Sequence, residues 1–166
     1  AMMRLARHLS TTARVGQEYE HDQVGYNYRM TNLQAAVGCA QMEQLEPFVA
    51  AKRRIARRYD DAFAGLKGTG RFPAAPWAES ACWFSGLTVD APDTATLREA
   101  LRGNGIDARP FWKPMHLQRP YRDAPRTALS VTESLWRRIV TLPCSTHLSD
   151  SEQDRVIAAT TAALAA

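Results

Sequence analysis

The longest periodic pattern in the sequence runs over residues 33–63 and favours helix. Apolar residues recur there every three or four positions, which is the repeat of one helix face. Pro47 lies inside the pattern and should break it, kink it, or occupy the first turn of a second helix. We therefore expect two consecutive helices, over residues 32–45 and 47–66.

A polar turn, GYNYRMTN (25–32), directly precedes this pattern. Thr31 and Gln34 have the spacing of a capping box, which marks a helix start. Asn27 and Arg29 offer amide and guanidinium donors, and the N–H groups and dipole at a helix start favour an anion such as phosphate. The alternative is a structural, tyrosine-rich turn that packs against a partner, and the residues alone leave both interpretations open.

The rest of the chain alternates helices with short strands. Residues rich in β-formers predict strands over 82–89 and 107–112, and Pro110 places the second one at a sheet edge. Further helices are expected over 2–14, 94–102, 127–140 and, after a capping box of Ser149 and Glu152, 149–164, with loops over 15–30 and 67–76 and an extended piece over 141–146. This order predicts an α/β fold with few strands.

Length and composition are those of one soluble domain, because the 166 residues are 45% hydrophobic and 23% charged. The net charge of +4 includes a basic cluster: Lys52, Arg53, Arg54, Arg57 and Arg58. A polyanion-binding patch is one interpretation of the cluster. We favour a solvated helix face, because no aromatic residues are interleaved for stacking on a nucleic acid.

The cysteines and histidines indicate neither a metal site nor disulfides. Cys39, Cys82 and Cys144 are odd in number, form no C-x-x-C pair, and are expected to be small core residues in a reducing compartment. The four histidines have no ligand spacing, and the acidic stretch EYEHD (18–22) is interpreted as a solvated loop. No signal peptide or 18-residue apolar run is present, so we expect a cytoplasmic protein without a membrane partner.

A second polar stretch, RPFWKPMHLQRPY (109–121), mixes cations with aromatic residues. The cations are Arg109, Lys113 and His116, and the aromatic residues are Phe111, Trp112 and Tyr121. Such a mixture suits a sugar ring stacked on an aromatic side chain with phosphates on the cations. The alternative is a surface loop stiffened by prolines.

Three stretches together resemble the DegT-type family of pyridoxal-phosphate-dependent sugar aminotransferases. They are HDQVGYNYRMTNLQAAVGCAQMEQLEPFVAAKRRIARRY (21–59), GIDARPFWKPMHLQRPY (105–121) and LPCSTHLSD (142–150). The resemblance implies the small C-terminal domain of a fold-type-I enzyme: a long helix pair followed by a small, mainly antiparallel sheet covered by helices. Residues 1–30 would be the end of a large domain, and residues 31–166 would be the small domain.

The resemblance also implies roles for individual residues. Asn27, with Arg29 beside it, would bind the cofactor phosphate of the neighbouring subunit across a dimer interface. His21, Lys113 and His116 would face the nucleotide-sugar. The family's Schiff-base lysine lies in a K…TGEGG-like segment that this sequence lacks. We therefore assign no catalytic residue here and expect no bound pyridoxal phosphate in this fragment alone.

The implied reaction moves an amino group from glutamate to a keto nucleotide-sugar during synthesis of a cell-surface polysaccharide of the lipopolysaccharide, O-antigen type. The fragment alone is expected to be inactive and to form a homo-oligomer, a dimer or larger, through an uncovered apolar helix face. An alternative is a non-catalytic binding or assembly module that acts with a separately encoded N-terminal chain. A nucleic-acid module that uses the Arg-rich helix ranks last.

Overall fold

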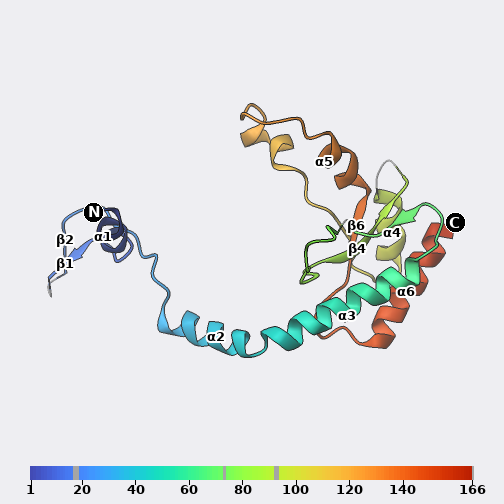
Figure 1. Cartoon of the computed structure of the whole chain (residues 1–166), viewed down its shortest axis with the longest axis horizontal. Helices are drawn as coiled ribbons and strands as arrows, with labels where there is room; N and C mark the ends of the chain where they lie inside the picture. The colour runs from blue at the N-terminus through green and yellow to red at the C-terminus, as the bar shows by residue number, and fades with distance from the viewer. Residues whose placement is uncertain (17–18, 73, 92–93, 166) are drawn as a thin grey trace. The chain divides into compact units, whose positions relative to one another are not determined.

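The computed structural model describes residues 1–16, 19–72, 74–91 and 94–165. The chain divides into two compact units, Ala1–Leu45 and Glu46–Ala166, hereafter unit 1 and unit 2 (Figure 1). These units are defined by contacts within the chain, and the domain boundary predicted at residue 30 stays a prediction.

Unit 1 contains two helices and a small hairpin. Its elements are α1 (Met2–Leu9), β1 (Arg14–Val15), β2 (Glu20–His21) and α2 (Asn32–Glu43), with β1 and β2 antiparallel. The expected helix over 2–14 is too long, because Thr12 and Ala13 have positive φ angles of 65° and 53° that end helical geometry. Val15 and β2 lie in the predicted loop over 15–30, whereas Arg14 of β1 lies at the end of the predicted helix.

The capping box at the start of α2 is confirmed. Thr31 Oγ1 accepts the Gln34 backbone N–H at 3.3 Å, and Gln34 Oε1 accepts the Thr31 N–H at 2.8 Å. No residue of α2 is buried, and the side chains of Leu33 and Val37 are among its exposed apolar groups. The apolar face of α2 is therefore uncovered within unit 1.

Unit 2 is a four-stranded antiparallel sheet with helices packed against it (Figure 1). Its helices are α3 (Leu45–Phe63, beginning one residue before the unit boundary), α4 (Ala95–Gly103), α5 (Ser130–Leu135) and α6 (Asp150–Ala165), with short 3-10 turns at Met115–Leu117, Arg119–Tyr121 and Trp136–Arg138. Its strands are β3 (Thr69–Gly70), β4 (Ser85–Val89), β5 (Arg109–Pro110) and β6 (Ile139–Leu142). This arrangement confirms the predicted α/β class and the mainly antiparallel sheet.

The strand order is β3-β4-β6-β5, so β5 lies at an edge as Pro110 predicted. β4 and β6 pair from Ser85↔Leu142 to Thr88↔Ile139. The expected helix over 127–140 is wrong at both ends, since α5 is short and β6 begins at Ile139. Ile139 and Val140 are β-branched and buried, and a central strand packs such residues well.

The core is formed by the sheet together with α3, α4 and α6. Ile55, Tyr59 and Phe63 are spaced four residues apart and all buried, which confirms the helical pattern, and Pro47 falls in the first turn of α3. The remaining buried apolar core residues are Leu87, Val89, Leu97, Leu101, Ile106, Ala108, Val140, Leu142, Cys144 and Val156. Burial of each large side chain contributes roughly 1.5–3 kcal/mol. The expectation that all cysteines are core residues is wrong for Cys39, which is exposed, and for Cys82, which is half-buried.

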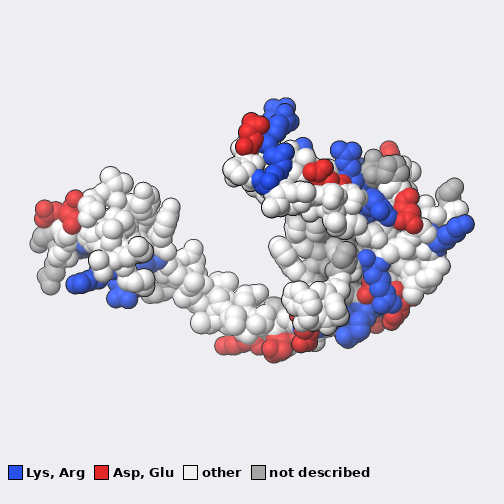
Figure 2. Space-filling model, turned by 45° about the horizontal axis from the view of Figure 1, so that its top comes forward, with Lys and Arg blue, Asp and Glu red and all other residues white. Residues whose placement is uncertain are grey.

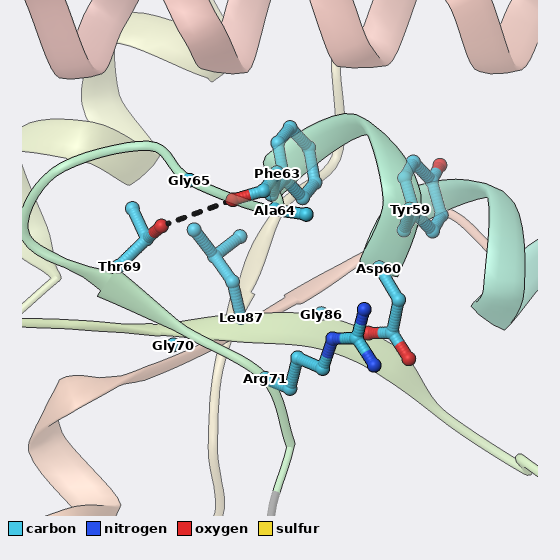
Figure 3. A pocket seen from close by; sticks show the side chains of 10 residues that line it. All are labelled: Tyr59, Asp60, Phe63, Ala64, Gly65, Thr69, Gly70, Arg71, Gly86 and Leu87. Atoms are coloured by element: carbon cyan, nitrogen blue, oxygen red, sulfur yellow. Dashed lines mark hydrogen bonds between the residues drawn. The ribbon is translucent and has the colours of Figure 1, made fainter.

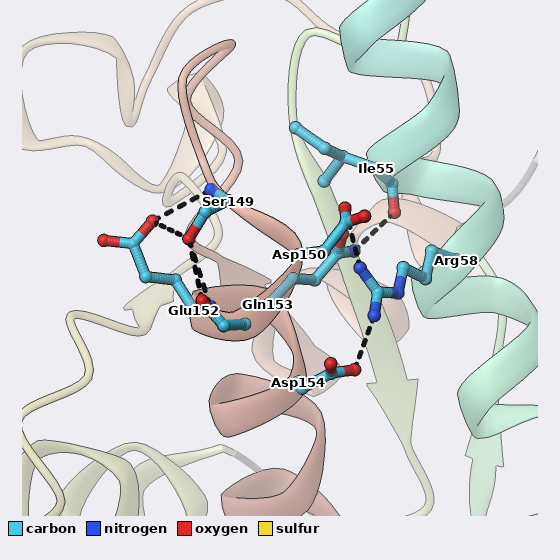
Figure 4. A network of polar contacts seen from close by, with 8 residues as sticks. Ile55, Arg58, Ser149, Asp150, Glu152, Gln153 and Asp154 are labelled. Carbon is cyan, nitrogen blue, oxygen red and sulfur yellow. Dashed lines mark hydrogen bonds and ion pairs between the residues drawn. The ribbon is translucent and has the colours of Figure 1, made fainter.

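A polar cluster joins α6 to α3 (Figure 4). The Arg58 guanidinium lies 2.8 Å from the Asp150 carboxylate and 2.6 Å from the Asp154 carboxylate. Gln153 is 1% exposed, and its Nε2 donates to the Ile55 carbonyl at 2.9 Å. This buried hydrogen bond fixes the register between the two helices.

Several cations of the basic cluster form ion pairs or hydrogen bonds with other residues of unit 2. Arg53 pairs with Glu79 at 2.5 Å, and Lys52 Nζ donates to the backbone carbonyls of Cys144 at 2.6 Å and Trp83 at 3.0 Å. On the face drawn in Figure 2, basic and acidic side chains of this unit are interspersed. The cluster therefore helps to hold the unit together. Within the described ranges, no helix has the length and apolar character needed to cross a membrane.

Candidate functional site

In unit 1, the turn before α2 is an extended segment held by the end of α1 and the residues that follow it. The backbone N–H of Tyr26 donates to the Leu9 carbonyl at 2.7 Å, and the Tyr26 carbonyl accepts from the Thr12 N–H at 3.1 Å. Gly25 is required because a Cβ at this position would lie 2.2 Å from the Thr12 carbonyl carbon. These contacts fix the position of residues 25–29.

Alternation along this extended segment separates its polar and aromatic side chains. Tyr26 and Tyr28 stack with ring centroids 5.1 Å apart. Asn27 and Arg29 alternate with these tyrosines along the chain and line a groove of about 730 Å³ with residues of the 10–16 segment. The structure thus brings the two predicted phosphate-binding residues to one surface.

The donors in this groove are nitrogen groups. The hydroxyl groups of Ser10, Thr11 and Thr12 donate to backbone carbonyls, so their oxygens remain as acceptors. Arg14 also lines the groove, with its guanidinium 4.3 Å from the Tyr19 ring centroid. The 10–16 segment could not be predicted as part of the site, because it is distant from Asn27 in the sequence and lies beside it only in the folded chain.

A second groove, of about 470 Å³, connects the same two residues to the start of α2. It is lined by Asn27, Tyr28, Arg29, Met30, Thr31 and Gln34. The positive end of the α2 dipole lies there, which adds to the attraction for an anion. With the amide and guanidinium donors, these grooves fit a phosphate group, and unit 1 contains no lysine.

His21 lies in β2 and lines neither groove. Its Nδ1–H donates to the Thr12 carbonyl at 2.7 Å, and the neighbouring Asp22 carboxylate pairs with His8 Nε2 at 2.6 Å. In unit 1, His21 therefore supports the hairpin, and its predicted approach to a substrate stays a prediction.

In unit 2, His116 and Lys113 lie on the same loop but have different surroundings. The His116 side chain is 9% exposed, and its Nε2 lies 2.9 Å from the Glu133 carboxylate. It lines a pocket of about 260 Å³ with Tyr121 and Arg126. Lys113 is exposed and does not line this pocket.

Trp112 belongs to a cluster of aromatic rings. Its ring centroid is 5.8 Å from that of Trp83, 4.9 Å from that of Phe84 and 5.2 Å from that of Phe111. The side chains of Trp83 and Trp112 are 68% and 57% exposed, so they form an aromatic surface next to Lys113. Only Phe111 and Trp112 were predicted, because Trp83 and Phe84 reach the cluster through sheet pairing.

Arg109, the third predicted cation of this stretch, is engaged locally. Its Nε and Nη2 donate to one Asp107 carboxylate oxygen at 2.9 and 2.6 Å. These bonds lower the pKa of Asp107 and raise that of Arg109. The Arg109 guanidinium is therefore paired with Asp107 beside β5 and is not a free cation.

A further pocket, of about 260 Å³, lies between α3 and the β3–β4 edge (Figure 3). The guanidinium of Arg71 extends toward the Asp60 carboxylate there. Burial raises the pKa of Asp60, and Arg71 opposes this shift. Burial also raises the pKa of Tyr59, whose hydroxyl donates to the Pro143 carbonyl at 2.8 Å.

No group of three or more potential metal ligands gathers in the part of the chain that the structure describes. Glu18 of the acidic stretch lies outside the described residues.

Comparison with known proteins gives one consistent family. A model described as the DegT/DnrJ/EryC1/StrS aminotransferase family matches residues 1–161. EpsN of Bacillus subtilis (strain 168) is 35% identical over 163 residues, which cover 95% of this chain and 42% of EpsN. GDP-perosamine synthase of Vibrio cholerae is 36% identical over 147 residues, which cover 82% of this chain and 38% of that enzyme.

Solved structures agree with this result. The crystal structure of the aminotransferase TlmJ from Streptoalloteichus hindustanus superposes with a TM-score of 0.85 and 27% identity, covering 98% of this chain and 44% of TlmJ. The chain therefore spans less than half the length of each of these proteins.

Proposed function

The chain belongs to the DegT/DnrJ/EryC1/StrS aminotransferase family, and from this premise we propose that it is the C-terminal part of a nucleotide-sugar aminotransferase. The observation that carries the proposal is the family match over residues 1–161, together with Asn27 and Arg29 on one groove surface. The similarity to GDP-perosamine synthase supports a nucleotide-linked sugar as substrate.

Pyridoxal phosphate would supply the electron-withdrawing ring that amino transfer needs. Asn27 and Arg29 would hold its phosphate through amide and guanidinium hydrogen bonds, which are charge-assisted on an anion. In the assembled enzyme these residues would serve the site of the neighbouring subunit. The donor chemistry of the groove supports this role.

The covalent lysine would come from a part of the protein outside residues 1–166. The three lysines, Lys52, Lys67 and Lys113, all lie in unit 2, away from the grooves of unit 1 in the chain. The Lys52 ammonium group is already held by two backbone carbonyls. Residues 1–166 alone would therefore be inactive.

The aromatic surface of Trp83 and Trp112 would hold the sugar or base, because aromatic faces offer apolar contact area with little loss of side-chain entropy. Lys113 beside it, with His116 and His21, would face the phosphates and hydroxyl groups of the nucleotide-sugar. Glutamate would be the amino donor, and the product would enter a lipopolysaccharide-type surface polymer. The enzyme would act in the cytoplasm as a dimer.

The test uses the protein encoded by residues 1–166 together with the genomic segment that precedes them. We expect it to transfer an amino group from glutamate to a keto nucleotide-sugar. Asn27→Ala with Arg29→Ala should weaken pyridoxal phosphate binding at least tenfold, because each charge-assisted bond contributes roughly 1.5–3 kcal/mol. Gln41→Ala, on the exposed surface of α2, is the matched control and should change nothing.

An unchanged cofactor affinity in the double variant would contradict the role of the groove. A preceding segment without a lysine of the K…TGEGG type would favour the alternative of an assembly module that acts with a second chain. Mixing the chain with that second chain and recovering activity would identify a two-chain enzyme.

A further inference from the structure

The side chain of His116 is held by a residue from a different element of unit 2. His116 lies in the 3-10 turn Met115–Leu117, whereas Glu133 lies in α5, 17 positions further along the chain. Their side chains meet with Nε2 of the imidazole 2.9 Å from a carboxylate oxygen. The imidazole is 9% exposed and the carboxylate is 52% exposed, so a half-exposed acidic residue reaches a ring that is largely buried.

The backbone that carries His116 is fixed independently of this contact. The Leu117 N–H donates to the Pro114 carbonyl at 3.0 Å, and the Gln118 side chain donates to the Lys113 carbonyl at 3.2 Å. Because the turn is held in this way, the freedom that remains to the imidazole is mainly rotation about its own side-chain bonds. The carboxylate from α5 therefore acts on that rotation.

The contact also decides which ring nitrogen can meet a ligand. A carboxylate only accepts hydrogen bonds, so the proton of a neutral imidazole stays on Nε2 and Nδ1 becomes an acceptor. Nδ1 of His116 has no hydrogen-bond partner among the described residues. Of those residues, Ser85 holds the one buried side-chain polar atom that lacks a partner, so Nδ1 of His116 retains access to solvent.

The chemistry of a nucleotide-sugar limits which of its groups can meet such an acceptor. Its phosphates and a keto oxygen only accept hydrogen bonds, whereas the hydroxyl groups of its sugars also donate. Arg126 lines the same pocket as His116 and offers only donors, which suit phosphates. The two side chains therefore suit different groups of one substrate, and the acceptor of His116 suits a hydroxyl group.

We propose that Glu133 is a positioning residue, which holds the His116 ring through Nε2 so that Nδ1 accepts a hydrogen bond from a hydroxyl group of the nucleotide-sugar. Glu133 itself does not contact the substrate. This inference rests on the proposed function, because the substrate is the one assigned there. A contact with a half-exposed carboxylate contributes little to stability, so an effect on the ring can be separated from an effect on folding.

The ring nitrogens of His116 test the positioning step in the chain of residues 1–166. Long-range ¹H–¹⁵N spectra at pH 8.5, above the range in which histidine ordinarily titrates, show which nitrogen carries the proton. We expect it on Nε2 in the unsubstituted chain and in Glu133→Gln, whose amide oxygen also accepts. In Glu133→Ala the two nitrogen signals should move toward each other, because part of the population then carries the proton on Nδ1. Glu99→Ala removes an exposed carboxylate from α4 and is the matched control.

The substrate step is tested in the protein that includes the preceding genomic segment. Glu133→Ala should raise KM for the nucleotide-sugar about three- to tenfold and leave kcat unchanged, because a misdirected acceptor loses one hydrogen bond made by the bound substrate. Glu133→Gln should restore most of this loss, and Glu99→Ala should show none. The affinity for pyridoxal phosphate should be the same in all variants. Glu133→Ser, too short to reach the ring, replaces Glu133→Ala if that variant fails to fold.

The two measurements separate failure of this inference from failure of the proposed function. Ring-nitrogen signals that are the same in Glu133→Ala and the unsubstituted chain would overturn the positioning role. An active protein whose KM is unchanged by Glu133→Ala, or is not restored by Glu133→Gln, would overturn it as well. An unsubstituted protein that transfers no amino group would instead contradict the proposed function, and the ring-nitrogen signals would still decide whether Glu133 directs His116.

Discussion

Asn27 and Arg29 are exposed side chains on an extended segment, and their direction is set by backbone hydrogen bonds to the last residue of α1 and to residues that follow it. Gly25 permits that contact because any Cβ there would clash with Thr12. Polar side chains placed on a fixed backbone next to a helix start are well suited to an anion. At the residue scale, the proposed phosphate contact depends on the side chains of Asn27 and Arg29.

The cap of α6 provides a residue-scale prediction. Ser149 Oγ accepts the Glu152 backbone N–H at 3.3 Å, and the Glu152 carboxylate accepts from the Ser149 N–H at 2.8 Å (Figure 4). Ser149→Ala should lower the free energy of unfolding by about 1 kcal/mol in urea titrations. An unchanged unfolding midpoint would contradict the capping role.

The same cap should respond to pH. Hydrogen bonds from Ser149 lower the pKa of Glu152 below its ordinary value of 4.5. A carboxyl group with a lowered folded pKa stabilises the fold above its unfolded pKa and loses this effect as the pH falls through the folded value. The stability difference between the unsubstituted chain and Glu152→Gln should therefore narrow below pH 4.5. A difference that stays constant on acidification would be evidence against this linkage.

The capping boxes at Thr31 and Ser149 could be predicted from sequence because each depends on residues three positions apart. The unpartnered, buried hydroxyl of Ser85 could not be predicted in this way, although the sequence shows a serine within the apolar run CWFSGLTV. Whether a buried hydroxyl has a partner depends on residues from other elements, here α3 and the 72–84 segment. Local patterns carry no information on that contact.

At the scale of elements, α3 organises unit 2 through one buried face and one charged face. Lys52 donates to the carbonyls of Trp83 and Cys144, and so links α3 to residues next to β4 and β6. Each of these acceptors is a backbone group that needs a partner when buried. The lysine thus has a structural role in this unit.

Lys52→Met should destabilise unit 2 by about 2 kcal/mol, because it keeps the apolar stem and removes charge-assisted hydrogen bonds. Lys67→Met, at an exposed position after α3, is the control and should change stability by less than about 0.5 kcal/mol. Thermal and urea unfolding of both variants provide the measurement. Equal stabilities of the two variants would show that the Lys52 contacts contribute nothing.

The region around β6 shows why element boundaries were harder to predict than element types. The sequence TESLWRRIV has helical spacing, yet Ile139 and Val140 belong to a strand that pairs on both sides. Burial in a central strand outweighs local helix preference at these positions. Conversely, α3 could be predicted because its buried residues recur at helical spacing over several turns.

At the scale of the whole chain, the two units differ in how they are stabilised. The described core belongs to unit 2, whereas Ala13 is the one buried apolar residue described in unit 1. A unit of 45 residues with so little core needs other contacts for stability. The exposed apolar face of α2 is available for such contacts.

We expect the chain to self-associate through that face. Leu33 and Val37 are one helical turn apart and expose 77% and 57% of their surface. Leu33→Glu with Val37→Glu should shift the chain toward monomer in analytical ultracentrifugation, whereas Ala35→Glu, on the other side of α2, should not. A monodisperse monomer of the unsubstituted chain would contradict this prediction.

The central claim is that residues 1–166 contribute phosphate-binding side chains to the assembled enzyme but do not bond the cofactor covalently. Spectrophotometric titration of the chain with pyridoxal phosphate tests it directly, since a lysine bonded to the cofactor produces a characteristic absorbance band. We expect no saturable band. A stoichiometric band that disappears when Lys52, Lys67 or Lys113 is replaced would contradict it.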